Sequence, residues 1–131
     1  MRHHFPDLAK LLVVHVGRSD DLSTAEYIER IESKPRFISI DGSHMARDVL
    51  FDLNLAAEIT SEAGIVAVDD FLNPMTLGVN EATARFMLDG NKDRLSPFCF
   101  CANKLYSVPT GLQICICARS RAVHSVPCKL S

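Results

Sequence analysis

Apolar residues follow two alternating patterns along residues 11–90. Three short segments, at residues 11–16, 36–40 and 65–68, are apolar nearly throughout and rich in β-branched residues, which is typical of buried strands. The segments between and after them, at residues 24–34, about 44–61 and about 78–88, space their apolar residues as helices do. This alternation predicts an α/β domain with a mostly parallel sheet, whose apolar strands are covered by flanking helices on both faces.

Local signals mark where these helices begin and end. Ser23 stands three residues before Glu26, a spacing that fits a capping box at the start of the first helix, and Pro35 ends that helix. Gly64 follows the second helix closely enough to stop it. The apolar stripe of the second helix consists of Met45, Val49, Leu53, Ala56 and Ala57. This stripe makes the second helix the most clearly defined element.

The C-terminal part of the chain has a weaker pattern. Segments 98–101 and 112–117 predict two further strands, joined by a turn at residues 107–111. From Ser107 onward no amphipathic period is found, and an irregular terminus is expected beyond Ala118. We therefore divide the chain into an α/β part, residues 1–106, and an atypical tail, residues 107–131.

Charge divides the chain in a similar way. All 16 acidic residues lie in residues 1–93, whereas residues 94–131 hold five basic residues, no acid and all five cysteines. Five positive charges without interleaved aromatic residues are weak support for nucleic-acid binding, so no nucleic-acid partner is expected. No apolar run reaches the ~18 residues of a membrane-spanning helix, and the N-terminus has no signal-peptide pattern. We expect a cytoplasmic protein with no membrane partner.

The cysteines form two Cys-x-Cys pairs, Cys99 with Cys101 and Cys115 with Cys117, and Cys128 stands alone. Structural zinc sites usually space the two cysteines more widely. On a strand, residues two apart share a face. We therefore expect these cysteines to be buried as small apolar side chains rather than to bind zinc.

Acidic residues follow all three predicted strands. They are Asp20 and Asp21, then Asp41, then Asp69 and Asp70. Parallel sheets bind ligands beyond the carboxyl ends of their strands, and carboxylates crowded there favour a cation between them. Asp also caps helices and turns, and capping is the favoured interpretation for Asp20 and Asp21. For the other three, a divalent cation or a basic substrate group is the alternative to capping.

Two segments resemble class I S-adenosylmethionine-dependent methyltransferases. Residues 37–44, Phe-Ile-Ser-Ile-Asp-Gly-Ser-His, and residues 64–71, Gly-Ile-Val-Ala-Val-Asp-Asp-Phe, are similar to the ends of the fourth and fifth strands in the branch of metal-dependent small-molecule O-methyltransferases. The resemblance covers about residues 11–90 and makes residues 11–16 the third strand. It implies a Rossmann-like fold and methyl transfer from S-adenosylmethionine to a small-molecule or sugar hydroxyl.

The resemblance also implies roles for particular residues. Asp41, Asp69 and Asp70 would bind Mg²⁺, which prefers oxygen ligands and would lower the pKa of a substrate hydroxyl. The branch often places a second acid, as a base, two residues after the first, where this chain has Ser43. His44 is the nearest titratable residue and is the candidate catalytic base; a structural role in the first turn of the helix is the alternative. The candidate cofactor-binding residues are Gly17, Ser19 and Asp41.

The family's glycine-rich cofactor loop has no counterpart in this sequence. The six glycines, at positions 17, 42, 64, 78, 90 and 111, are too far apart to form it, so residues 1–106 are interpreted as the C-terminal part of a truncated methyltransferase domain. In that fold, two further strands separate the third strand from the fourth. Without them a strand edge stays exposed, which predicts homo-oligomers. The alternative functions are a non-catalytic α/β interaction module and a metal-dependent hydrolase that uses Asp41, His44, Asp69 and Asp70.

Overall fold

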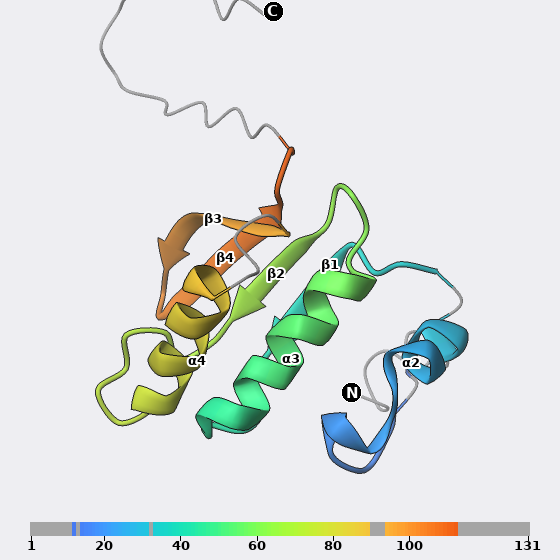
Figure 1. Ribbon diagram of the computed structural model, residues 1–131, viewed down its shortest axis with the longest axis horizontal. Coiled ribbons are helices and arrows are strands. Elements are labelled where there is room, and N and C mark those ends of the chain that lie inside the picture. Colours follow the sequence, from blue (N-terminus) through green and yellow to red (C-terminus); the bar gives the residue numbers. More distant parts are fainter. Residues whose placement is uncertain (1–11, 13, 32, 90–93, 113–131) are drawn as a thin grey trace, which may run out of the picture.

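The computed structural model describes residues 12, 14–31, 33–89 and 94–112. Strands and helices alternate up to residue 88, and a hairpin follows (Figure 1). The helices are the 3-10 helix η1 (Ser19–Asp21), α2 (Thr24–Ile31), α3 (Ala46–Ile59) and α4 (Leu77–Leu88). The strands are β1 (Phe37–Ile40), β2 (Ile65–Val68), β3 (Leu95–Cys101) and β4 (Lys104–Pro109). Within the described residues, no helix is both long enough and apolar enough to cross a membrane.

The strands form one mixed sheet in the order β1-β2-β4-β3. β1 and β2 are parallel, whereas β4 runs antiparallel to both β2 and β3. The prediction of an α/β fold is confirmed, but the prediction of a mostly parallel sheet is wrong, because only the β1–β2 pair is parallel. The physical reason is the short link between β3 and β4. A parallel pair needs a crossover of a dozen or more residues, and only Ala102 and Asn103 separate these two strands.

The turn between β3 and β4 consists of Ala102 and Asn103, whose φ angles are 50° and 66°. Two central residues with positive φ are typical of tight hairpin turns that match the twist of the strands. The prediction of a turn at residues 107–111 is wrong, because residues 107–109 complete β4. The boundary drawn after residue 106, between the α/β part and the tail, therefore falls inside β4. Of the strand predicted at residues 112–117, Leu112 lies in no strand, and the other positions lie outside the described residues.

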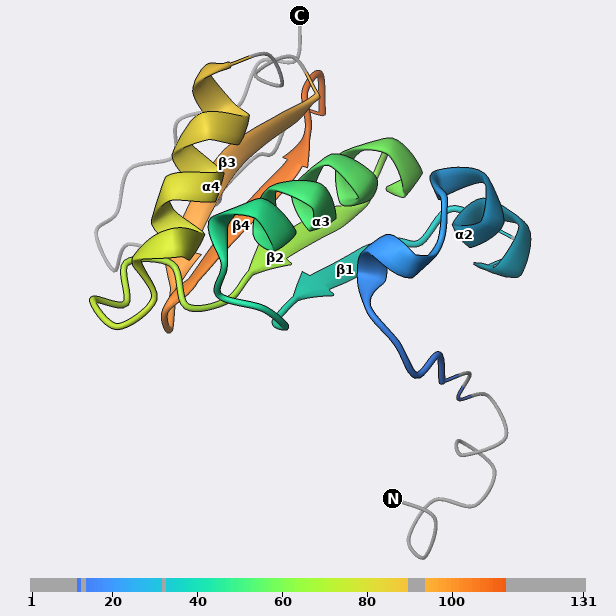
Figure 2. The ribbon, with the colours of Figure 1, turned by 60° about the horizontal axis from the view of Figure 1, so that its bottom comes forward.

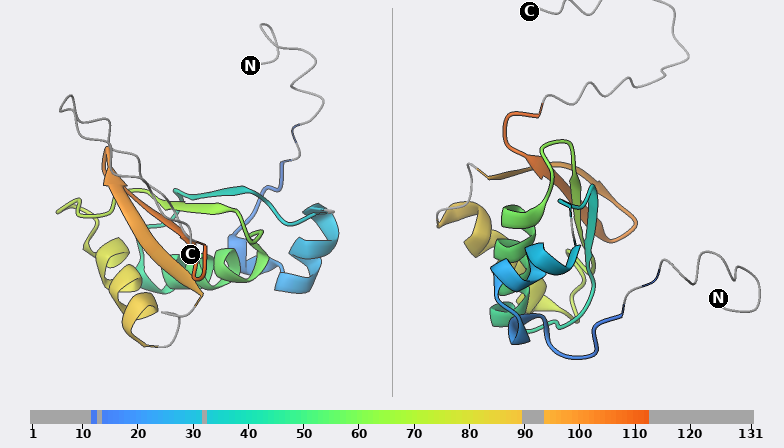
Figure 3. Two further views of the ribbon diagram at one scale, coloured as in Figure 1. Left: turned by 90° about the horizontal axis from the view of Figure 1, so that it is seen from above. Right: turned by 90° about the vertical axis from the view of Figure 1, so that its right-hand side faces the viewer.

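The two longest helices cover one face of the sheet. Figures 1 and 3 show α3 and α4 against this face, and Figure 2 shows α2 beyond α3, on the side of β1. Within the described part of the chain no helix lies on the opposite face, so the expected cover on both faces is not found there. Phe37, which alternates along β1 with the inward-facing Ile38, is 59% exposed as a result.

The hydrophobic core lies between this helical layer and the sheet. Val49 and Leu53 from α3, Val66 from β2 and Phe86 from α4 are all at most 2% exposed. The apolar stripe predicted for the second helix is therefore confirmed for most of its length. The prediction is wrong for the first member of the stripe, Met45, which is the N-cap residue of α3 and is 69% exposed.

The segment before η1 does not form the strand predicted at residues 11–16. Leu12, Val14 and Val16 are exposed and belong to no strand, and residues 11 and 13 lie outside the described residues. Backbone N–H and C=O groups favour a strand only where a neighbouring strand pairs with them. In the described residues β1 pairs only with β2, so this segment has no strand beside it.

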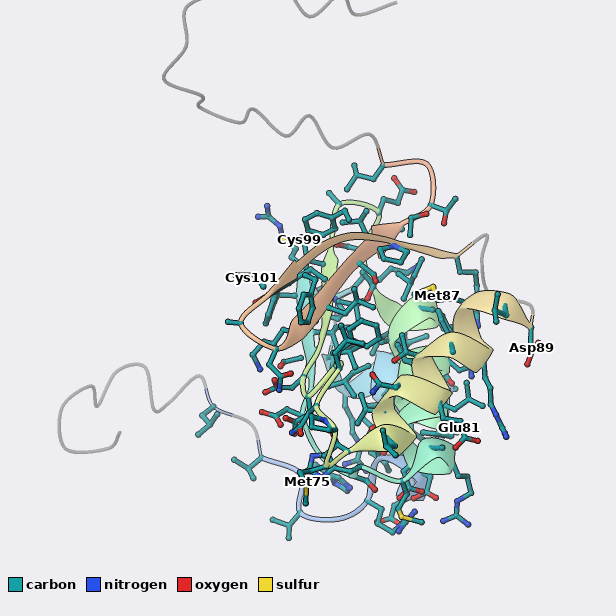
Figure 4. The ribbon with its side chains drawn as sticks, turned by 90° about the vertical axis from the view of Figure 1, so that its left-hand side faces the viewer. Met75, Glu81, Met87, Asp89, Cys99 and Cys101 are labelled. Carbon is teal, nitrogen blue, oxygen red and sulfur yellow. The ribbon has the colours of Figure 1, made fainter. Side chains whose placement is uncertain are left out.

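The cysteines on β3 are free and exposed, not buried as expected. Figure 4 labels Cys99 and Cys101 on this strand. β3 is the edge strand at the far side of the sheet from β1, which explains why these side chains lack cover. Cys115, Cys117 and Cys128 lie outside the described residues.

Candidate functional site

The carboxyl ends of β1 and β2 meet at one edge of the sheet. The register places Ile40 beside Val68, and the backbone N–H of Asp69 donates to the carbonyl oxygen of Ile40 at 2.9 Å. Asp41 and Asp69 therefore follow neighbouring strands at the same level. Parallel pairing thus brings together the strand-end acids that the sequence singled out.

A cleft of about 620 Å³ lies beside β1, and residues of α3 and of the segment that carries η1 line it. Gly17 and Ser19 from that segment line it, as does Asp41 from the end of β1. The structure thus gathers in one cavity the three residues that the methyltransferase resemblance assigns to the cofactor.

α3 adds two acidic residues to the cleft, Asp48 and Asp52, which are four residues apart and share a helix face. Ser43 Oγ donates to Asp48 at 2.8 Å, and the Arg18 guanidinium donates to it at 3.1 Å. These contacts, that of Ser43 foremost, lower the pKa of Asp48. Arg18 also contacts Asp20 at 2.7 Å, so it ties η1 to α3.

The pKa of Asp52 shifts in the opposite direction, upward. Burial raises its pKa, although a hydrogen bond with Ser19 partly offsets this. Tyr27 lies nearby and donates its hydroxyl to the carbonyl oxygen of Ser19 at 3.2 Å; burial, and then the charge of Asp52, raise the pKa of Tyr27. Sequence reasoning missed Asp48, Asp52 and Tyr27. The spacing of the two aspartates on the polar side of the predicted helix is the signal that points to them.

The capping interpretation agrees with the geometry around η1. The carboxylate of Asp21 accepts a hydrogen bond from the backbone N–H of Arg18 at 2.7 Å. This contact closes the first turn of η1, as a capping carboxylate does.

Asp70 is the centre of a second cluster at the same sheet edge. Its Oδ2 lies 2.9 Å from His44 Nε2, and its Oδ1 accepts hydrogen bonds from Asn73 at 2.9 Å and from Asn103 at 2.8 Å. Its φ of 55° lies in the left-handed region, which Asp adopts more readily than most residues do. The structure thus brings His44 and Asp70 together. Asn103 comes from the β3–β4 turn, and no pattern in the sequence points to it.

Asp69 is paired with a lysine that sequence reasoning also missed. Lys104 Nζ donates to its Oδ2, and the backbone N–H of Asp70 donates to its Oδ1 at 2.9 Å. The bond from Lys104 foremost, and then the Asp70 N–H, lower the pKa of Asp69. The same pairing raises the pKa of Lys104. The lysine reaches Asp69 across 35 residues of sequence, through the antiparallel pairing of β2 with β4.

These contacts do not fit the expected Mg²⁺ site. The carboxylate oxygens of Asp69 and Asp70 contact nitrogen groups, whereas Mg²⁺ needs oxygen ligands in near-octahedral geometry. In the part of the chain that the structure describes, no three His, Cys, Asp or Glu side chains are grouped to hold a metal ion. The expectation that Asp41, Asp69 and Asp70 bind Mg²⁺ therefore finds no support in this arrangement.

Comparison with known families links the cleft and the strand ends to one family. A family model described as a methyltransferase domain matches residues 2–71, which is more than half of the chain. The matched residues include Gly17, Ser19, Asp41, His44 and Asp70, and they end before α4 and the β3–β4 hairpin. No curated protein matches the sequence. The chain therefore belongs to the methyltransferase-domain family.

Proposed function

We propose that this domain binds S-adenosylmethionine in the cleft beside β1 and serves methyl transfer to a hydroxyl group of a small molecule or sugar. One observation carries the proposal: Gly17, Ser19 and Asp41 line the same cleft of about 620 Å³. The family model covers all three residues.

The charge of the cleft suits this cofactor. Asp41, Asp48 and Asp52 line it together with one guanidinium, that of Arg18, so the lining is net negative when these groups are ionised. S-adenosylmethionine carries a sulfonium, an ammonium and a carboxylate, and is therefore net positive. A cleft lined by one sign of charge raises the local concentration of ligands of the opposite sign. The acidic lining thus favours binding of the cofactor.

His44 is the candidate base for the acceptor hydroxyl. S-adenosylmethionine, when bound, supplies the methyl group, and its sulfur takes up the electrons of the broken carbon–sulfur bond. The hydroxyl proton must then go to a protein group. Asp70 holds the His44 ring through Nε2 at 2.9 Å, which leaves Nδ1 as the nitrogen that can accept this proton. A histidine oriented by a carboxylate is a recurrent form of general base.

The alternative functions have less support. A metal-dependent hydrolase would use Asp69 and Asp70 as ligands, but both side chains already contact nitrogen donors. A non-catalytic interaction module would use the exposed edge of β1, but this function would give no role to the cleft or to Gly17, Ser19 and Asp41, which line it.

The wide spacing of the glycines limits the expected affinity. Without a glycine-rich turn, fewer backbone N–H groups can approach the cofactor closely. We infer that the chain corresponds to the C-terminal part of a methyltransferase domain. Its dissociation constant for S-adenosylmethionine should be roughly 100 μM, which is tighter than a millimolar encounter but far from nanomolar.

Calorimetric titration of S-adenosylmethionine into the full chain tests this proposal, once circular dichroism shows that the chain is folded. Asp41→Asn removes one negative charge from the cleft and should weaken binding about tenfold, as loss of a partly screened charge pair does. Asp89→Asn is the matched control: it makes the same charge change at an exposed acid just after α4 (Figure 4). It should leave binding unchanged. A folded chain that shows no binding at about 1 mM cofactor, or equal effects of the two variants, would refute the cleft as the cofactor site.

A further inference from the structure

A lysine stands where the strand-end acids crowd together. β2 and β4 pair with Val68 opposite Leu105, and one step further along this antiparallel register Asp69 lies opposite Lys104. The tight turn at Ala102 and Asn103 begins β4 at Lys104. The hairpin thus sets the lysine side chain at the carboxyl edge of the sheet.

The lysine is firmly engaged at this edge. Its ammonium group donates to Asp69 Oδ2, and the two side chains are only 30% and 21% exposed. Asp41 adds a second carboxylate, because it follows β1 at the level of Asp69 and lines the same small pocket. The ammonium therefore supplies the positive charge that two crowded carboxylates need.

Both carboxylate oxygens of the neighbouring Asp70 also have protein partners. Asp70 contacts His44 through one oxygen and accepts from Asn73 and Asn103 through the other. A divalent cation would have to displace both the ammonium and these donors. Such a displacement is costly because each donor would lose a charge-assisted hydrogen bond.

We propose that Lys104 is a built-in cation that replaces a divalent metal at the carboxyl ends of β1 and β2, so that this site works without a metal. This inference rests on the methyl-transfer function proposed for the cleft. Lys104 is a positioning residue: it fixes Asp69 and balances its charge. Because an ammonium group cannot coordinate an acceptor oxygen as a metal does, removal of the acceptor proton falls to His44.

Manganese binding to the full, metal-free chain tests this inference, with Mn²⁺ as the probe and electron paramagnetic resonance of the free ion as the readout. The wild-type chain should bind Mn²⁺ more weakly than about 1 mM, the weak end for carboxylate sites. Lys104→Met removes the ammonium and leaves Asp41 and Asp69 uncompensated, so Mn²⁺ affinity should rise about tenfold or more. Lys104→Arg keeps the positive charge and should stay as weak as the wild type.

Lys34→Met is the matched control, because it removes the same charge at an exposed position before β1, at the opposite edge of the sheet. It should not change Mn²⁺ binding. Wild-type binding at about 0.1 mM or tighter would overturn the inference, as would a folded Lys104→Met chain with no gain, or an equal gain in Lys34→Met. If Lys104→Met does not fold, Lys104→Gln takes its place, and the wild-type titration still decides. The assay contains no S-adenosylmethionine, so failure of the cofactor proposal would leave its outcome unaffected.

Discussion

Gly78 is a point where α4 touches the start of α3, and we predict that Gly78→Ala destabilises the domain. A Cβ atom at this position would lie 2.3 Å from the carbonyl oxygen of His44 and 2.9 Å from the backbone nitrogen of Ala46. Both are backbone atoms, so no side-chain rotation relieves the overlap. The two helices would have to move apart at the residue that carries the candidate base.

Two opposing terms set the size of this effect. Overpacking of a tight contact costs about 1–3 kcal/mol, and a contact with backbone places the cost near the upper end. Alanine is favoured over glycine inside a helix by up to about 1 kcal/mol, and Gly78 is the second residue of α4. The free energy of unfolding should therefore fall by about 2 kcal/mol.

Urea unfolding followed by far-ultraviolet circular dichroism measures this change, since the chain has no tryptophan for a fluorescence assay. Gly42→Ala is the control, because nothing lies within 4 Å of a Cβ there; its stability should stay within about 0.5 kcal/mol of the wild type. The imidazole resonances of His44 should shift in Gly78→Ala, because its contact with Asp70 depends on the position of the α3 start. A Gly78→Ala chain as stable as the wild type would refute the reasoning, since helix propensity would then outweigh the close contact.

Three further predictions concern the core, the cleft and the edge of the sheet. Leu53→Ala should lower the free energy of unfolding by about 3 kcal/mol, because Leu53 is 1% exposed, whereas Leu88→Ala at a 79% exposed position should change it by less than about 0.5 kcal/mol; similar urea midpoints for the two variants would contradict this. Asp52→Asn should raise the urea midpoint at neutral pH and have less effect in acid. Burial raises the folded-state pKa of Asp52. The carboxyl of Asp52 therefore stabilises the fold below its unfolded-state pKa, where it is protonated, and this stabilisation is lost as pH rises through the folded-state pKa. An Asp52→Asn chain that is less stable than the wild type at neutral pH would refute this pH dependence. Sedimentation velocity should show self-association as concentration rises, because β1 is an edge strand with an exposed Phe37, and Phe37→Lys should weaken it; a monomer at every concentration would argue against association at this edge.

Local patterns predicted most of the individual elements. The capping box at Ser23 forms as expected: the Ser23 N–H donates to Glu26 at 2.8 Å, and the Glu26 N–H donates to Ser23 Oγ at 3.3 Å. β1, β2, α3 and α4 also lie close to their predicted positions. Such signals act over a few residues, so they can be interpreted without knowledge of the fold.

The candidate site was predictable only in part. Asp41, Asp69 and Asp70 reach one sheet edge because parallel strands end there together, and the order of strands and helices already indicates this. Lys104 and Asn103 come from the β3–β4 hairpin, which lies beyond residue 71, where the match to the family model ends. Their contacts with the acids depend on the direction of β4, which no local pattern specifies.

The sequence by itself determined the positions of β1, β2, α3 and α4, most of the apolar stripe of α3 and the acids that follow the strands, because hydrophobic periodicity and capping are local properties of the chain. Only the tertiary structure decided that β4 runs antiparallel between β2 and β3, that Lys104 pairs with Asp69, and that Gly17, Ser19 and Asp41 share one cleft with Asp48 and Asp52. The physical reason is that a hydrophobic pattern specifies which face of a strand is buried but not which strand lies beside it. Strand direction depends on turn conformation and link length, and here the turn at Ala102 and Asn103, both of positive φ, made β3 and β4 antiparallel neighbours.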